Sequence, residues 1–184
     1  GQKTLFKTRP VVGFIHALVA WGFTFYLIVN VFDVLYGFIP GFHFFPNYII
    51  GKTYRICVDI FTVLVLLGVI YFLVRRFITK DYRLEINNPV MLSDEAKIGM
   101  KRDSLLVGAF ILFHVGSRFL SASFEIAQNK PDWYQPAATM LSMFWAGMDF
   151  ESLVMFEHIS WWLALGLILG FLPYFPYSKH AHLF

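Results

Sequence analysis

Residues 11–32 read VVGFIHALVAWGFTFYLIVNVF, a run of 22 residues that contains no Asp, Glu, Lys or Arg. An α-helix needs about 20 consecutive apolar residues to cross the hydrocarbon core of a bilayer, so this run predicts a membrane-spanning helix. Arg9-Pro10 marks its start, because proline is tolerated in the first turn of a helix. Asp33 and the glycines and proline of residues 37–41 mark its end.

Three more long apolar runs follow along the chain. Ser93-Asp94-Glu95 is a helix-start signal ahead of the third run, and the fourth run begins near residues 149–152. Residues 136–147 predict a short helix at the membrane interface. The whole chain, residues 1–184, is expected to form one domain. The predicted fold class is an all-α integral membrane protein, a bundle of four transmembrane helices over about 11–32, 56–74, 103–127 and 150–174.

The overall composition supports this fold class and excludes several others. Hydrophobic residues make up 58% of the chain and charged residues 15%, whereas a soluble domain has about 25% charged residues. The net charge of +3 and the lack of a basic tract argue against nucleic-acid binding. The single cysteine, Cys57, excludes an internal disulfide and any cysteine-ligated cluster built by this chain alone. The chain begins at Gly1 without an initiator Met, so we expect a piece of a larger protein.

The distribution of basic residues predicts the orientation of the bundle. Eleven lysines and arginines lie on the side that holds the N-terminus, and three lie on the other side. Positive residues accumulate on the cytoplasmic side of membrane proteins, so both termini are predicted to be cytoplasmic in a multi-pass protein of the cytoplasmic membrane. The eleven are Lys3, Lys7, Arg9, Arg75, Arg76, Lys80, Arg83, Lys97, Lys101, Arg102 and Lys179; the three are Lys52, Arg55 and Lys130.

Histidines near the cytoplasmic side form the first candidate site. His16 lies about 9 Å along the first helix from Pro10, and small residues share its face. Small residues beside a histidine admit a flat ligand, or they simply allow a close helix crossing with a hydrogen-bonded histidine. His180 and His182 follow the fourth span on the same side. Two histidines at a common depth on two helices suit a haem with two imidazole ligands.

A polar stripe on the third span forms the second candidate site. His114, Arg118 and Glu125 share one face of an otherwise apolar helix, so this face is expected to turn toward the bundle, a cavity or a cofactor. Glu157-His158 is the counterpart on the fourth span. Three interpretations remain open: a second haem on His114 and His158, a buried hydrogen-bond network, or a quinone or proton site that includes Arg118, Glu125 and Glu157.

Two motifs resemble a known family. They are Arg9-Pro10-Val11-Val12-Gly13-Phe14-Ile15-His16-Ala17-Leu18 with Trp21-Gly22-Phe23, and Trp161-Trp162 followed by Phe175-Pro176-Tyr177-Ser178-Lys179-His180-Ala181-His182. They resemble the core helices of nitrate-reductase gamma subunit-like cytochromes b. This group includes the membrane subunit of heterodisulfide reductase and the membrane domains of bacterial iron–sulfur oxidoreductases. The resemblance covers nearly the whole chain.

The resemblance implies a set of cofactor ligands. His16 and His182 match the axial ligands of the haem b nearer the cytoplasm, with Lys179 and His180 at the propionate or partner-facing rim. Members with two haems carry a second histidine pair where this chain has Tyr26 and Ala164. One haem is therefore expected; a second would need a displaced pair, His114 and His158.

The function implied by the resemblance is electron transfer. The chain would be the membrane domain of a quinone-linked oxidoreductase complex and pass electrons between quinone or menaquinone and a heterodisulfide reductase-like iron–sulfur protein or fused domain on the cytoplasmic side. The iron–sulfur clusters would lie in that partner, not in this chain. Two other interpretations stay open: a haem-free membrane anchor or small transporter-like subunit, and a haem-free quinone-binding subunit.

Overall fold

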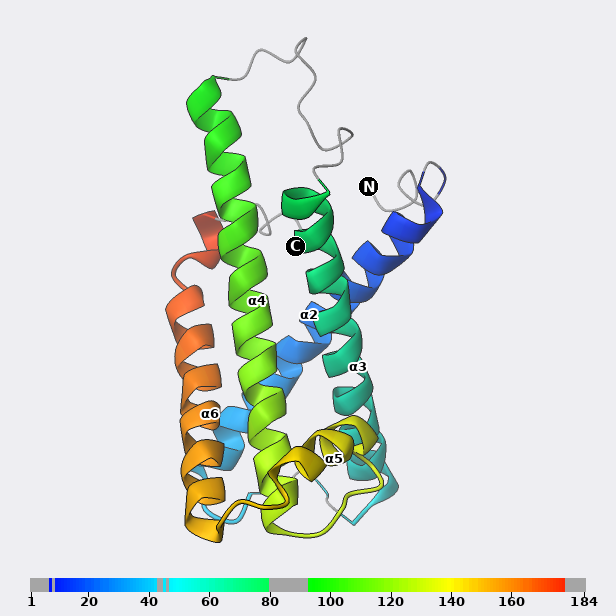
Figure 1. Cartoon of the computed structure of the whole chain (residues 1–184), viewed down its shortest axis with the longest axis vertical. Helices are drawn as coiled ribbons and strands as arrows, with labels where there is room; N and C mark the ends of the chain where they lie inside the picture. Colours follow the sequence, from blue (N-terminus) through cyan, green and yellow to red (C-terminus); the bar gives the residue numbers. More distant parts are fainter. Residues whose placement is uncertain (1–6, 8, 43–44, 46, 80–92, 178–184) are drawn as a thin grey trace.

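The described part of the chain forms a helical bundle without any strand (Figure 1). The computed structural model describes residues 7, 9–42, 45, 47–79 and 93–177. Four of its helices are long and apolar enough to cross a membrane, which confirms the predicted fold class. They are α2 (Pro10–Phe38), α3 (Ile49–Leu73), α4 (Asp94–Gln128) and α6 (Phe150–Phe171), and the short helix α5 (Pro136–Ser142) lies between the last two.

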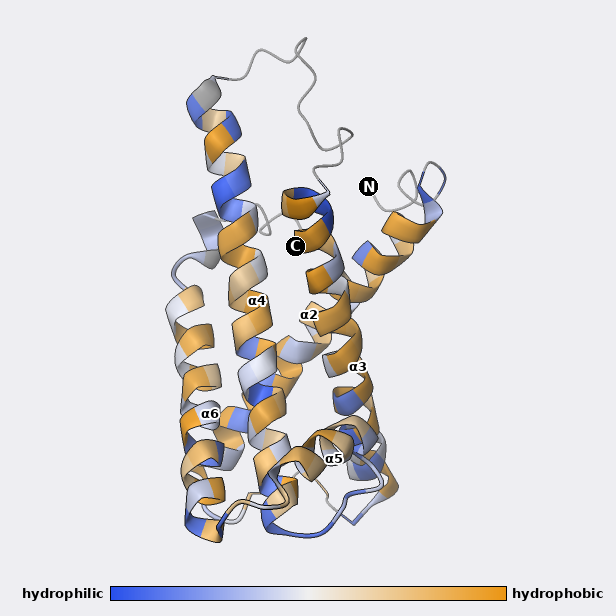
Figure 2. Cartoon of the chain, viewed as in Figure 1, coloured by the Kyte–Doolittle hydropathy of each residue, from blue (hydrophilic) through white to orange (hydrophobic). Residues whose placement is uncertain are grey.

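The long helices pack around a core of β-branched and aromatic side chains. α4 runs antiparallel beside α6, α3 packs against α4, and α2 crosses the bundle at a tilt (Figure 1). Apolar residues cover most of the length of the helices, and hydrophilic ones gather toward their ends and at a few positions within them (Figure 2). Gly22 permits the close approach of α2 to α3, because a Cβ there would overlap the side chain of Val65. The fully buried Val29 and Val65 lie in this core.

Three of the four helices extend beyond the apolar runs that predicted them, whereas α6 ends at Phe171, three residues before the predicted end at 174. α2 continues past Asp33 to Phe38, and α3 begins at Ile49, ahead of Arg55. Both charged residues lie inside helices because each is paired with an opposite charge from a distant segment. At its other end α3 continues through Arg75-Arg76 as a π-helical turn, Val74–Ile78.

The local signals for helix starts are confirmed. The hydroxyl of Ser93 accepts a hydrogen bond from the Ala96 N–H at 3.2 Å and caps α4. The carboxylate of Asp149 accepts from the Ser152 N–H at 2.8 Å and caps α6. The short helix predicted within 136–147 is α5, followed by a 3₁₀ turn, Met143–Trp145.

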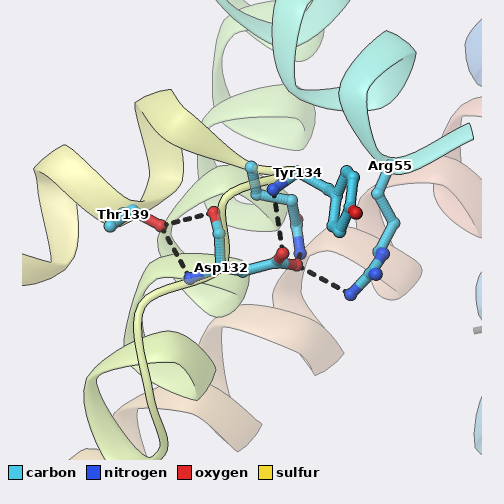
Figure 3. Close-up of polar contacts among 5 residues, drawn as sticks. Arg55, Asp132, Tyr134 and Thr139 are labelled. Carbon is cyan, nitrogen blue, oxygen red and sulfur yellow. Dashed lines mark hydrogen bonds and ion pairs between the residues drawn. The ribbon is translucent and has the colours of Figure 1, made fainter. Parts of the chain in front are cut away.

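Two residues of α3, one helical turn apart, hold the connection between α4 and α6. The buried carboxylate of Asp59 accepts hydrogen bonds from the N–H groups of Ala137 and Ala138 at 2.7 and 3.0 Å, and so caps the start of α5. Arg55 donates to the carboxylate of Asp132 at 2.8 Å, in the loop before α5 (Figure 3). We call this end of the bundle the α5 end.

The Asp132 loop is further fixed by its own hydrogen bonds (Figure 3). The carboxylate of Asp132 accepts from the Tyr134 N–H at 2.9 Å, and the Thr139 hydroxyl donates to the Asp132 carbonyl at 3.0 Å. The guanidinium of Arg55 lies over the Tyr134 ring, 5.1 Å from its centroid. The loop is therefore an ordered wall at the α5 end.

Candidate functional site

A cavity of about 850 Å³ lies at the α5 end of the bundle. Residues of α2, α3, α4 and α6 and of the Asp132 loop line it, so its walls come from segments far apart in sequence. Charged and aromatic side chains dominate the part formed by the helices. These are Asp33, Tyr36, Tyr54, Arg55, Arg118, Glu125, Glu157 and Trp161.

A bidentate ion pair joins α2 to α4 in the wall of this cavity. The Nε and Nη2 groups of Arg118 donate to the two carboxylate oxygens of Asp33 at 2.6 and 2.9 Å. The guanidinium also lies over the ring of Tyr26, 5.9 Å from its centroid, and the Tyr26 hydroxyl is hydrogen-bonded to Thr62. Paired contacts of this kind fix both the position and the plane of the guanidinium. Arg118 thus keeps N–H donors beyond the two that Asp33 accepts, because a guanidinium has five.

Two carboxylates from different helices line the same cavity. Glu125 comes from the last turn of α4, and Glu157 from α6. Trp161, one turn after Glu157, forms an aromatic wall, and its ring packs directly on Gly37 of α2. The cavity therefore combines a fixed cation, carboxylates that can accept protons, and flat aromatic surfaces.

His114 does not line this cavity but lies deeper in the bundle. It is 4% exposed, and its Nδ1 donates to the carbonyl oxygen of Ala164 on α6 at 2.8 Å. Its ring stacks on Phe110, with centroids 5.6 Å apart, and meets the edge of Tyr26. The predicted stripe on α4 thus faces the bundle interior at His114 and the cavity at Arg118 and Glu125.

The structure does not bring His158 to the same place as His114. The side chain of His158 is 64% exposed, and its Nδ1 lies 2.7 Å from the Val154 carbonyl oxygen. The same nitrogen lies 3.2 Å from a carboxylate oxygen of Glu157, so Glu157 links the cavity to this exposed imidazole. His158 is thus exposed, whereas His114 is buried in the core.

His16 lies on α2, near the opposite end of the bundle from α5. It is half-buried, and its ring meets the edge of Phe72 on α3, with centroids 6.4 Å apart. Its predicted partner His182 lies outside the described residues, as do Lys179 and His180. Within the described ranges no three His, Cys, Asp or Glu side chains come together as a metal site.

Five of the eight charged and aromatic side chains in the cavity wall were not predicted as site residues, and these are Asp33, Tyr36, Tyr54, Arg55 and Trp161. Asp33 was interpreted as the end of a span, and Tyr36 and Tyr54 carried no site prediction. A signal for Asp33 was nevertheless present. Arg118 is a cation inside an apolar run, such residues pair with an opposite charge inside membranes, and Asp33 borders another apolar run. The two tyrosines gave no comparable signal, because aromatic residues occur throughout this chain.

The chain is similar to segments of two curated proteins. It is 28% identical over 192 residues to the probable iron–sulfur-binding oxidoreductase FadF of Bacillus subtilis, with 100% of the chain and 24% of that protein aligned. It is 25% identical over 183 residues to the EtfAB:quinone oxidoreductase of Syntrophomonas wolfei, with 96% of the chain and 24% of that protein aligned. No family model and no solved structure matches it. The chain spans about a quarter of the length of these relatives, and through that segment it is related to oxidoreductases that transfer electrons.

Proposed function

We propose that the chain is the membrane electron-transfer domain of a quinone-linked oxidoreductase and that it connects quinone to an iron–sulfur protein or domain through haem b. The observation that carries this proposal is the cavity of about 850 Å³ among membrane-spanning helices, in which a fixed guanidinium, two carboxylates and aromatic side chains converge. The names of the two relatives also support this proposal, because one is an iron–sulfur-binding oxidoreductase and the other is a quinone oxidoreductase.

The cavity suits a quinone head group in size and chemistry. Small-molecule sites typically measure about 300–1,000 Å³ and combine apolar walls with a few placed polar groups. Interconversion of quinone and quinol moves two electrons and two protons. The N–H groups of Arg118 can donate to a quinone oxygen, and the carboxylates of Glu125 and Glu157 can accept or return the protons. Trp161 and Tyr36 provide flat surfaces for the ring.

His16 would be one of the two residues that hold haem b. It is a half-buried imidazole on a membrane-spanning helix, which is a ligand type and setting that b-type haem uses. We propose His182 as the second ligand, with Lys179 and His180 placed toward the propionates or the partner. Haem b supplies single-electron transfer when it is bound. The role of this chain would be to hold the haem between two helices and to provide the side chains around it.

The surroundings of Tyr26 and Ala164 support one haem per chain. The second histidine pair of the resembling family falls at these two positions. Here the Tyr26 hydroxyl is engaged by Thr62, and the Ala164 carbonyl accepts from His114. The side chain of His114 thus contacts both positions, through this hydrogen bond and through the edge-on contact of its ring with Tyr26.

The orientation follows from the basic residues. We propose that the α5 end faces away from the cytoplasm, that both termini are cytoplasmic, and that the iron–sulfur partner docks on the basic cytoplasmic side. Electrons would then cross the bundle between the cavity and the haem at His16, within the cytoplasmic membrane.

Haem stoichiometry tests the first part of the proposal. A pyridine haemochrome assay of the purified protein should give one haem b per chain. The His16→Ala variant should lose it, and the His158→Ala variant should keep it, because His158 is exposed. Full haem content in the His16→Ala variant would refute the ligand assignment. Absence of haem from the wild-type protein would leave the anchor or the haem-free quinone subunit.

Quinone-dependent electron transfer tests the second part. The Arg118→Met variant should raise the KM for the quinone, since it removes a donor to the quinone oxygen. The Glu157→Gln variant should lower kcat by about a hundredfold, the low end for loss of a proton-transferring group. The Thr53→Ala variant serves as the control, because Thr53 is exposed on α3 and does not line the cavity. Wild-type kinetics in both cavity variants would exclude this cavity as the quinone site.

A further inference from the structure

A second, much smaller cavity lies in the core of the bundle. Its volume is about 20 Å³, and residues of all four long helices line it. This is room for one water molecule, which needs at least about 10–15 Å³. Most of the lining is apolar, with Phe110, Val65 and Ile168 among it. The polar residues in the lining are His114, Asn30 and Tyr26, and the Tyr26 hydroxyl is engaged by Thr62.

His114 presents a buried acceptor at this cavity. Its Nδ1 lies 2.8 Å from the Ala164 carbonyl oxygen, and a carbonyl can only accept, so Nδ1 carries the hydrogen. In the neutral ring, Nε2 then carries a lone pair. This atom is buried, and no described residue donates to it. Buried polar atoms in folded proteins nearly always have a partner, either protein or ordered water.

Asn30 supplies the second polar group. It lies on the apolar helix α2, half-buried, and it lines the same cavity. Its side-chain amide adds both a donor and an acceptor to a mostly apolar lining. Amide groups inside a membrane need a partner, because lipid offers none. Two polar side chains on different helices thus line a cavity that has room for one water molecule.

We propose that this cavity binds a single structural water, which donates to Nε2 of His114 and accepts from the side-chain amide of Asn30. The water joins α2 to α4, and the Nδ1 hydrogen bond extends the connection to α6. His114 is therefore a hydrogen-bond acceptor in the core and not a ligand of iron. This assignment does not depend on the proposed function of the larger cavity.

The direct test is a structure of the whole protein at a resolution that shows ordered water. One density peak within hydrogen-bonding distance of Nε2 of His114 is expected in the wild-type protein, and none at that place in the Asn30→Leu variant. A dry cavity in the wild-type protein would overturn the proposal.

A double-mutant cycle on thermal stability gives an independent test. Since one water serves both side chains, the loss of Tm in the Asn30→Leu/His114→Phe double variant should be smaller than the sum of the single losses by about 3 °C or more. Thr24→Val on the same helix is the matched control, because the Thr24 hydroxyl donates only to the Ala20 carbonyl. It should be additive with His114→Phe. Additive losses for Asn30 and His114 would contradict a shared water.

Haem content separates this assignment from iron ligation. The His114→Phe variant should keep the haem stoichiometry of the wild-type protein. Loss of one haem per chain in this variant would make His114 an iron ligand and overturn the proposal. If His114→Phe does not fold, the wild-type and Asn30→Leu structures still decide the question.

Discussion

The cap that α3 places on α5 gives the most direct energetic prediction. Asp59 is 3% exposed, and its two carboxylate oxygens accept from the second and third residues of α5, Ala137 and Ala138. Replacement of Asp59 by Ala leaves both N–H groups without an acceptor at a helix start that has no other cap. A hydrogen bond to a charged group contributes about 1.5–3 kcal/mol, so loss of two at the lower value destabilises the fold by about 3 kcal/mol.

The assay is thermal unfolding of the purified protein in one detergent. For a chain of this size, about 3 kcal/mol corresponds to a fall in Tm of roughly 6–12 °C. The Asp59→Asn variant should fall between wild type and Asp59→Ala, because its amide oxygen still accepts one hydrogen bond. Thr53→Ala, at an exposed position of the same helix, is the control and should leave the Tm unchanged. A Tm of the Asp59→Ala variant within 2 °C of wild type would show that the cap contributes little, about 1 kcal/mol or less.

Two further predictions concern packing and pH. The Gly37→Ala variant should lose about 1–3 kcal/mol of folding stability and weaken quinone binding, because its Cβ would overlap the Trp161 ring in the cavity wall. The control is Gly99→Ala on α4, whose Cβ meets no other atom and which should gain about 0.5–1 kcal/mol of folding stability. Equal melting curves for the two variants would refute this packing argument. At α6, the hydrogen bond from the Ser152 N–H, aided by its hydroxyl, lowers the pKa of Asp149 from its ordinary value of 3.8. The stabilisation by the Asp149 carboxylate is therefore present above pH 3.8 and disappears as the pH falls through the lower folded-state pKa. The difference in Tm between wild type and the Asp149→Ala variant should therefore become smaller in acid. A difference in Tm that stays constant from pH 7 to pH 3 would contradict the capping role.

The sequence was sufficient to predict the number of spans and the helix starts that depend on local chemistry. Ser93 and Asp149 cap helices with their own side chains, and such signals lie within a few residues of what they control. The ends of α2 and α3 could not be placed equally well. Asp33 and Arg55 resemble stop signals until their partners are known, and those partners lie 85 and 77 residues away in sequence.

At the candidate site, too, the sequence predicted what depends on neighbouring residues and not what depends on contacts between distant segments. Helical spacing put Arg118 and Glu125 on one face of α4, and both line the cavity. The spacing did not reveal that His158 points outward while His114 points inward, because α6 is apolar on nearly all sides and no face is marked as buried. The role of Asp59 depends on the start of α5, which only the folded chain brings to it.

The cap on α5 also has a consequence for the order in which the protein is made. Asp59 is synthesised 78 residues before the first N–H group that it accepts from. At a synthesis rate of about 5–20 residues per second, roughly 4–16 s pass before that partner leaves the ribosome. During this interval α3 enters the membrane with a carboxyl group whose native partners do not yet exist. Biogenesis of this bundle must therefore tolerate a buried carboxyl group without its native hydrogen-bond donors until α5 has been made.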